Sequence, residues 1–571
     1  MSDTWDDLGP LIIGVVLLVL TLLIAPSVQK LPWYYPWRSD SRLGMLLGLS
    51  AGGFLTLFYR VCLGRDIPEE VVEFSETLFF DLLFPFVIFN AGFGFKRVLF
   101  FANSGLILLL AIAGTLVAFA IIAAGISLLV DYRDWDSFYS DGVSLSDILA
   151  LGAIFAATDT VAVLQILNQD EYPMLYSLAF GEGLVNDAVA VVLAKAVDGT
   201  TSDELSASVV FELIGVVIYL FVLSVLVGIL FGLATAFLLR RCFFLQRSHH
   251  APAEVGVLML SSFMAYYVSE ASQLSAITTI FVCGIVGGHY SWHNLNDTGK
   301  ILSMEFSTMA SDLCELTMFI LAGLDTFNIN LWKEAYARHV CELFFMALFL
   351  IVLARAVVIY PCCYLANTSR PEAFKVSMAY QTGLWAGGLI RGTVTVALAY
   401  KAFGGSIGSS ESDSEGKYEA HSTFLATTLL IVQFTSIIFG TLSEPVFNWL
   451  CQDDETSSNI YRFIPMILRN RGVKQDTFLD QDMLESKRRA SGAVNPHHQV
   501  HGTLDSTGQK STMELNNVTE GTELLGSRHP TNSLSLSRRR TADIKGCVSG
   551  MLVEACVSGM LVEACVSGML V

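Results

Sequence analysis

The chain has 571 residues, of which 53% are hydrophobic and only 15% charged, and its formal net charge at pH 7 is -19. Apolar runs of about twenty residues, the length at which a helix crosses a bilayer, recur from Leu8 to Leu450. This composition excludes a soluble enzyme. The runs are rich in Leu and Phe and seldom alternate with period two, so they predict an all-α polytopic membrane protein rather than a β-barrel.

About thirteen transmembrane helices are expected. They fall at roughly residues 8–29, 42–63, 77–94, 104–130, 147–168, 175–197, 206–239, 254–270, 274–290, 305–325, 337–366, 375–403 and 421–450. Acidic residues precede the first span, so we expect it to be retained as a helix rather than cleaved as a signal peptide. An outside N-terminus places Lys96, Arg97, Arg240 and Arg241 in cytosolic loops, as the positive-inside rule requires, and an odd number of spans leaves the C-terminus in the cytosol.

Three regions follow from the composition along the chain. Residues 1–450 form the predicted transmembrane domain. Residues 451–475 mix apolar and basic side chains, which favours a segment lying on the cytosolic leaflet or beneath a cytosolic regulatory protein, with an ordinary connector as the alternative. Residues 476–571 are polar and predicted to be disordered, and they end in a short repeat of CVSGMLVEA from which we infer no function.

Two carboxylates, Glu182 and Asp187, interrupt the apolar span that contains FGEGLVNDAVAVVLAKA. A carboxylate at the centre of a span costs about 2.5–3.5 kcal/mol, so each one needs a partner, a water-filled cavity or a bound ion. At about 100° per residue, Asn186 shares a helix face with Glu182, whereas Asp187 lies about 140° away. We therefore expect Glu182 to face a fixed base and Asp187 to face a cavity, where a cation or a proton neutralises it.

Bases inside the spans are scarce, and Arg355 and Arg391 are the clearest of them. Each is costly to bury without a carboxylate nearby. We predict that Arg355 pairs with Glu182 and that Arg391 pairs with Glu315. Both pairs are also compatible with a purely structural role in fixing helix register.

Polar residues and glycines disrupt one span in each half of the chain. Thr158, Asp159 and Thr160 interrupt the first, and Gly383, Gly387, Gly388 and Gly392 interrupt the second. Broken helices offer free carbonyls and helix ends to a cation, and one broken span per half is typical of inverted-repeat carriers. An unbroken helix with one polar face is the alternative for the first span. The chain carries no metalloprotease, P-loop or nucleophile-elbow motif, and we expect no cofactor.

Four segments carry a resemblance to a known family: LFFDLLFPFVIFNAGFGFK, AATDTVAVLQILNQDEYPMLYSLAFGEGLVNDAVAVVL, FVCGIVGGHYSWHNL and AGGLIRGTVTVALAY. In these segments the chain resembles the sodium/proton exchangers of the monovalent cation/proton antiporter superfamily, with the plant vacuolar type and its endosomal relatives as the nearest likeness. The resemblance covers about residues 40–450.

The resemblance implies an ion site that contains Asn186, Asp187, Thr158 and Asp159. Glu182, Arg355 and Arg391 would be its supporting charges. It also implies electroneutral exchange of Na⁺ or K⁺ for H⁺, a homodimer whose core domain moves like an elevator against a dimer domain, and a vacuolar or endosomal membrane, with the plasma membrane as the alternative. Two rival functions remain: a cation channel lined by the same carboxylates, and a transport-inactive sensor that signals through its tail.

Overall fold

The computed structural model describes residues 40–451 except 65–73, 95–96, 134, 136–142, 168–171, 199–206, 242–250, 371–374 and 405–414, and also residues 16 and 18–20. Every regular element in this part of the chain is a helix, which confirms the all-α prediction. The chain divides into two units, Met1–Ala490 and Ser491–Val571, and all of these helices belong to the first. The predicted segments 451–475 and 476–571 lie outside the described residues, apart from Cys451.

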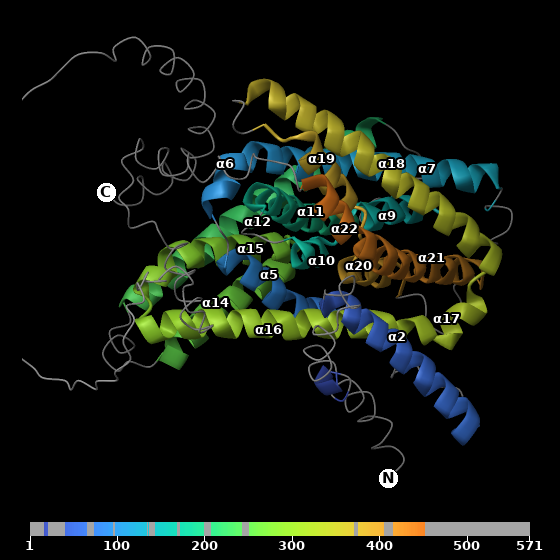
Figure 1. Ribbon diagram of the computed structural model, residues 1–571, viewed down its shortest axis with the longest axis horizontal. Coiled ribbons are helices and arrows are strands. Elements are labelled where there is room, and N and C mark those ends of the chain that lie inside the picture. The colour runs from blue at the N-terminus through green and yellow to red at the C-terminus, as the bar shows by residue number, and fades with distance from the viewer. Residues whose placement is uncertain are drawn as a thin grey trace, which may run out of the picture. The chain divides into compact units, whose positions relative to one another are not determined.

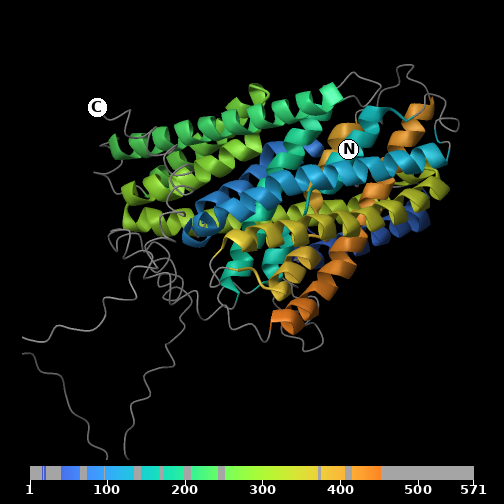
Figure 2. The same ribbon diagram turned by 90° about the horizontal axis from the view of Figure 1, so that it is seen from above.

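The helices pack as two groups (Figures 1 and 2). We call the first the flanking bundle; it comprises α2 (Asp40–Phe58), α4 (Glu76–Leu78), α5 (Phe84–Phe93), α14 (Ala251–Ala271), α15 (Ala276–Val286) and α16 (Asp297–Leu324). We call the second the site bundle; it comprises α6 (Arg97–Leu108), α7 (Thr115–Tyr132), α9 (Leu145–Ala156), α10 (Thr160–Ile166), α11 (Pro173–Asp198), α18 (Ala337–Ser369), α19 (Met378–Gly387), α20 (Thr393–Phe403), α21 (Glu415–Phe434) and α22 (Gly440–Cys451).

Two helices connect these groups. The long α12 (Ala207–Arg241) packs against α14 and α15 on one side and against α11 on the other. The short α17 (Ile329–Glu334) lies between α16 and α18 in the chain and packs against α21. Direct contact between the two bundles is sparse, and α11 and α20 touch α15 and α16 at only a few positions.

Wide and tight helical turns continue several of these helices. The π-helical segments are η2 (Tyr59–Leu63), η3 (Phe79–Leu83), η4 (Leu109–Gly114), η5 (Gly287–Ser291) and η10 (Thr435–Phe439), and the 3₁₀ segments are η6 (Trp292–Asn294) and η7 (Asp325–Phe327). Such π segments are frequent at functional sites. Thr115 directly follows η4, and Thr435 lies within η10. The hydroxyl group of each forms a hydrogen bond with a residue of the site described below.

Nine helices in the described residues are long and apolar enough to cross a membrane. α9 and α20 are shorter apolar helices, and each faces a second half-helix, α10 and α19 respectively, across a break. The two predicted interruptions are therefore present. The total of about thirteen spans stays a prediction, because most of the first expected span, 8–29, lies outside the described residues.

Glycines allow helices of the flanking bundle to touch backbone to backbone, as small residues commonly do inside membranes. A Cβ added to Gly284 of α15 would lie 3.0 Å from the carbonyl oxygen of Phe89 and 3.1 Å from the Cα atom of Gly92, both on α5. Any side chain at Gly284 must therefore push α5 and α15 apart.

We expect Gly284→Val to lower the free energy of unfolding by about 1–3 kcal/mol, because overpacking forces the two backbones to separate. Thermal unfolding of the detergent-solubilised protein measures the effect. Gly256→Val in α14 is the matched control, since a Cβ there meets nothing within 4 Å. Equal losses in the two variants would show that the α5–α15 contact is not the cause.

Candidate functional site

The two interrupted helices pack beside α11 (Figure 1). The first break, residues 157–159, separates α9 from α10, and the second, residues 388–392, separates α19 from α20. The Asp159 amide donates to the carbonyl oxygen of Ile390 at 2.9 Å, so a backbone hydrogen bond joins the breaks directly. Glycine is needed at 392, because a Cβ there would collide with the Asp159 carboxylate.

Side chains supply the hydrogen bonds that the broken helices lose. The Asp159 carboxylate accepts from the Ala162 amide at 3.1 Å and so caps α10. The Arg391 guanidinium donates to the Ala157 carbonyl oxygen at the end of α9. Thr435 and Ser436 of η10 bond the amide and the carbonyl of Arg391. Both breaks are thus held by protein groups, as non-helical backbone inside a membrane must be.

Asn186 uses both ends of its amide to hold this crossing. Its Nδ2 donates to the Ala156 carbonyl oxygen at 3.2 Å and to the Thr158 hydroxyl at 2.8 Å, and its Oδ1 accepts from Thr115 at 2.7 Å. The side chain is only 2% exposed. The geometry therefore makes Asn186 a brace for the break in the first interrupted helix, next to the carboxylate of the following residue.

Asp187 faces a cavity of about 50 Å³ between the two bundles. Thr158, Asp159 and Gly392 line the cavity from the site bundle, and Glu315 lines it from the flanking bundle. Asp187 is 5% exposed, and its Oδ1 has no hydrogen-bond partner in the part of the chain that the structure describes. Its charged neighbours are Asp159 and Arg391. A carboxylate so poorly solvated is stable when a proton or a cation neutralises it.

The predicted pairing of Glu182 with Arg355 is confirmed. Arg355 Nη1 lies 2.5 Å from Glu182 Oε1, and both side chains are buried. Arg355 also donates to the Leu384 carbonyl oxygen at 3.3 Å, and a Cβ at Gly388 would collide with its guanidinium. The pair thus supports the second interrupted helix and leaves Asp187 out of its contacts, as the angle between Glu182 and Asp187 predicted.

The predicted pairing of Arg391 with Glu315 is wrong. Arg391 lies inside the second break and donates to a backbone carbonyl of the first, whereas Glu315 accepts from Ser41 at 2.6 Å and from Gln165 at 2.5 Å. The physical reason is that a broken helix exposes carbonyl oxygens, which accept hydrogen bonds from a buried guanidinium, while the nearby Asp187 supplies the negative charge. Glu315 instead joins α16 of the flanking bundle to α10 of the site bundle.

Sequence reasoning missed three residues of this region: Thr115, Ser41 and Gln165. Each carries a single polar group within or at the edge of an apolar run. That signal is weak, because a buried Ser or Thr often bonds only to the carbonyl four residues earlier in its own helix. Thr115 does make such a bond, to Ala111, and bonds Asn186 in addition.

We expect Glu182→Gln and Arg355→Gln each to lower the free energy of unfolding by about 3–5 kcal/mol, because each leaves a buried charge without its partner. The double variant Glu182→Gln/Arg355→Gln should lose less than either single variant, since it buries no unpaired charge. Thermal unfolding in detergent tests this, with Asp297→Asn, which removes a fully exposed carboxylate, as the control. A double variant no more stable than the single variants would contradict the expectation.

Asn186→Asp should destabilise the crossing rather than add a second ion-binding charge. An aspartate cannot donate to the Ala156 carbonyl or the Thr158 hydroxyl, so two buried hydrogen bonds are lost. We expect a lower melting temperature and slower transport, whereas Thr115→Ser, which keeps its donor, should change neither. A stable Asn186→Asp protein with full transport would refute the bracing role.

Two membrane helices that break where they cross, beside a buried carboxylate that faces a cavity, form the kind of ion site found in secondary transporters. The comparisons with known proteins agree with this class. The family model for the transmembrane part of sodium/hydrogen exchangers matches residues 10–449.

Sodium/hydrogen exchanger 1 of Arabidopsis thaliana is 33% identical over 457 residues, which span 78% of this chain and 80% of that protein. Sodium/hydrogen exchanger 1 of Oryza sativa subsp. japonica is 32% identical over 417 residues, which span 72% and 74% of the two chains. The solved structure of the sodium proton antiporter MjNhaP1 from Methanocaldococcus jannaschii at pH 8 has a TM-score of 0.55 and 17% identity, covers 78% of this chain and 99% of its own, and shares the fold.

The chain belongs to the sodium/hydrogen exchanger family. It is a multi-pass membrane protein, and its function is cation/proton antiport.

Proposed function

We propose that this antiporter exchanges one Na⁺ or one K⁺ for one H⁺, and that Asp187 carries each ion in turn. The observation that supports the proposal is the balance of buried charge at the crossing. There the site bundle holds three carboxylates, Asp159, Glu182 and Asp187, against the two guanidiniums of Arg355 and Arg391. Within the site bundle one negative charge is left over, and a single proton or a single alkali cation neutralises it.

Competition for that charge suffices to couple the two ions. A bare carboxylate is too costly to carry across the hydrocarbon region, whereas the protonated and the cation-bound forms are both neutral. If only the neutral forms cross, a cation moving one way obliges a proton to move the other way. Asn186, Thr158 and Asp159 complete the site in this proposal by fixing the backbone around Asp187.

We infer that the crossing step is an elevator movement of the site bundle against the flanking bundle. The sparse contact between the bundles, and the cavity that separates Asp187 from α5 and α16, support a surface along which one bundle slides. The flanking bundle would then be the fixed part and form a homodimer. Large apolar side chains of α2, such as Phe54 and Leu57, are exposed and suit a lipid or protein neighbour.

We infer the orientation of the protein, and the membrane in which it resides, from the sequence. The positive-inside rule places the N-terminal end of α11 and the C-terminus of the chain on the cytosolic side. The resemblance to the plant vacuolar and endosomal exchangers favours one of those membranes. A cytosolic regulator that binds residues 451–475 is part of the same proposal.

We expect Asp187→Asn to abolish exchange while leaving a folded protein, because an uncharged amide offers no negative charge for a proton or an alkali cation to neutralise. The measurement is proton flux in proteoliposomes driven separately by Na⁺ and by K⁺ and followed with a pH-sensitive dye. Asp297→Asn, at a fully exposed carboxylate, is the matched control and should exchange normally.

Three outcomes would contradict the proposal. Cation-dependent proton flux retained by Asp187→Asn would remove the carboxylate from its role. A current without coupled proton movement would indicate a channel instead of an electroneutral antiporter. Absence of flux in the unaltered protein with both cations would favour a transport-inactive sensor.

A further inference from the structure

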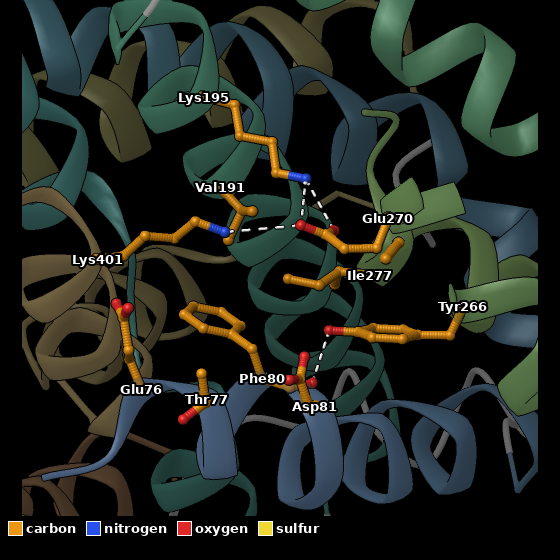
Figure 3. A pocket seen from close by; sticks show the side chains of 11 residues that line it. Glu76, Thr77, Phe80, Asp81, Val191, Lys195, Tyr266, Glu270, Ile277 and Lys401 are labelled. Carbon is orange, nitrogen blue, oxygen red and sulfur yellow. Dashed lines mark hydrogen bonds and ion pairs between the residues drawn. The ribbon is translucent and has the colours of Figure 1, made fainter. Parts of the chain in front are cut away.

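Two lysines of the site bundle converge on one glutamate of the flanking bundle (Figure 3). Lys195 of α11 donates to both carboxylate oxygens of Glu270 in α14, at 2.9 and 2.8 Å. Lys401 of α20 lies 3.7 Å from the same carboxylate, and its ammonium lies 5.1 Å from the centre of the Phe80 ring. The three side chains therefore join two helices of one bundle to a helix of the other.

Lys195 makes a third contact across the interface. Its ammonium donates to the carbonyl oxygen of Leu274 at 3.1 Å, in the turn that leads from α14 to α15. Only 15% of its side chain is exposed, so most of its solvation comes from groups of the flanking bundle. A displacement of α11 along this interface removes these contacts together.

Lys195 of the cluster lies on the same helix as Asp187, closer to the C-terminal end of α11. Lys195 follows Asp187 by eight residues, which corresponds to about 12 Å along α11. It borders its own cavity, of about 100 Å³, which shares no lining residue with the cavity at Asp187. The buried side chains of Val191 and Ile277 line the cluster's cavity on the way to Asp187 and lie below Lys195 in Figure 3.

The cavity at Asp187 extends toward the other end of α11. Among its described lining residues, α11 contributes Phe180, Leu184 and Asp187, and nothing that follows Asp187 in the chain. The N-terminal end of α11 is the cytosolic end by the positive-inside rule. By this orientation the cavity lies on the cytosolic side of Asp187, and the lysine–glutamate cluster occupies the opposite end of the interface.

We propose that Lys195, Lys401 and Glu270 are the gating residues of the exchange reaction: their ion pairs hold the non-cytosolic end of the interface shut while Asp187 faces the cytosol. This inference rests on the proposed movement of the site bundle against the flanking bundle. When that bundle moves to expose Asp187 at the other face, Lys195 and Lys401 leave Glu270 and the end opens.

The partial exposure of the cluster suits a gate that opens in every cycle. Glu270 is 36% exposed and Lys401 43%, so water can solvate both when they separate. Ion pairs that are partly exposed shift an equilibrium by only about two- to fivefold. A fully buried pair such as Glu182–Arg355 would hold the end too tightly to be broken repeatedly.

The test is the accessibility of residue 191 from the non-cytosolic side. A Val191→Cys reporter, in proteoliposomes of known orientation, is labelled with a membrane-impermeant maleimide and quantified on the peptide that carries residue 191. We expect Glu270→Gln to speed labelling about two- to fivefold by shifting the population toward the open end. Lys401→Gln should also speed labelling. It replaces Glu270→Gln in the test if that variant does not fold.

Glu342→Gln is the matched control. Glu342 of α18 binds Arg133 and Arg338, so it too is one carboxylate between two bases, but all three residues belong to the site bundle and its loops. Its removal should leave the labelling rate unchanged.

An unchanged labelling rate in folded Glu270→Gln and Lys401→Gln would overturn the gate, and so would an equal increase in Glu342→Gln. The exchange assay separates this failure from failure of the proposed function. If Asp187→Asn still exchanges, the function proposed for that carboxylate fails, whatever the labelling shows. If Asp187→Asn is inactive and labelling does not respond to Glu270, only the gate fails.

Discussion

One buried carboxylate oxygen without a hydrogen-bond partner among the described residues is the constraint on which the rest of this structure depends. Asp187 Oδ1 lies in a protein interior within the membrane, where an isolated negative charge is costly. The other charged groups at the crossing bond to protein: Glu182 to Arg355, Asp159 to the end of α10 and Arg391 to a carbonyl. In the proposed mechanism this oxygen of Asp187 is the position that a proton or a cation completes in turn, and antiport follows from the competition between the two ions.

The broken helices serve that position by bringing backbone groups close to it. Breaking two helices inside a membrane exposes carbonyl and amide groups that must be satisfied. Asn186, Arg391, Thr435 and Ser436 satisfy several of them, and these side chains come from three separate stretches of the chain. Because the break is fixed from several directions, its geometry can persist through the movement proposed for the site bundle.

Because the site lies between two helix bundles, the contacts on the two sides of Asp187 differ. On one side of Asp187 a cavity opens between the bundles, and on the other side the ion pairs of Glu270 join them. Glu315, which joins α16 to Gln165 of α10, is a second polar contact across the same interface. In the proposed exchange cycle such contacts form and break in turn. Weak, partly solvated pairs at the interface therefore complement the strong, buried pair inside the site bundle.

Hydropathy by itself determined that this chain is a bundle of membrane helices, because lipid leaves helices as the only way for runs of about twenty apolar residues to satisfy their backbone. Helical geometry placed Glu182 and Asp187 on different faces, and the scarcity of buried bases left Arg355 and Arg391 as candidate partners, of which Arg355 was predicted for Glu182. The polar and glycine-rich interruptions at 158–160 and 383–392 located the two breaks.

The partners of Arg391 and Asn186 were decided only by the tertiary structure. A buried guanidinium requires an acceptor, but sequence does not reveal whether that acceptor is a carboxylate or a carbonyl exposed by a broken helix. The answer depends on which two breaks cross and at what distance, and that crossing is a property of the packed bundle. For the same reason Thr115, Ser41 and Gln165 carried no recognisable signal: a single hydroxyl or amide gains its role only from the group that folding places opposite it.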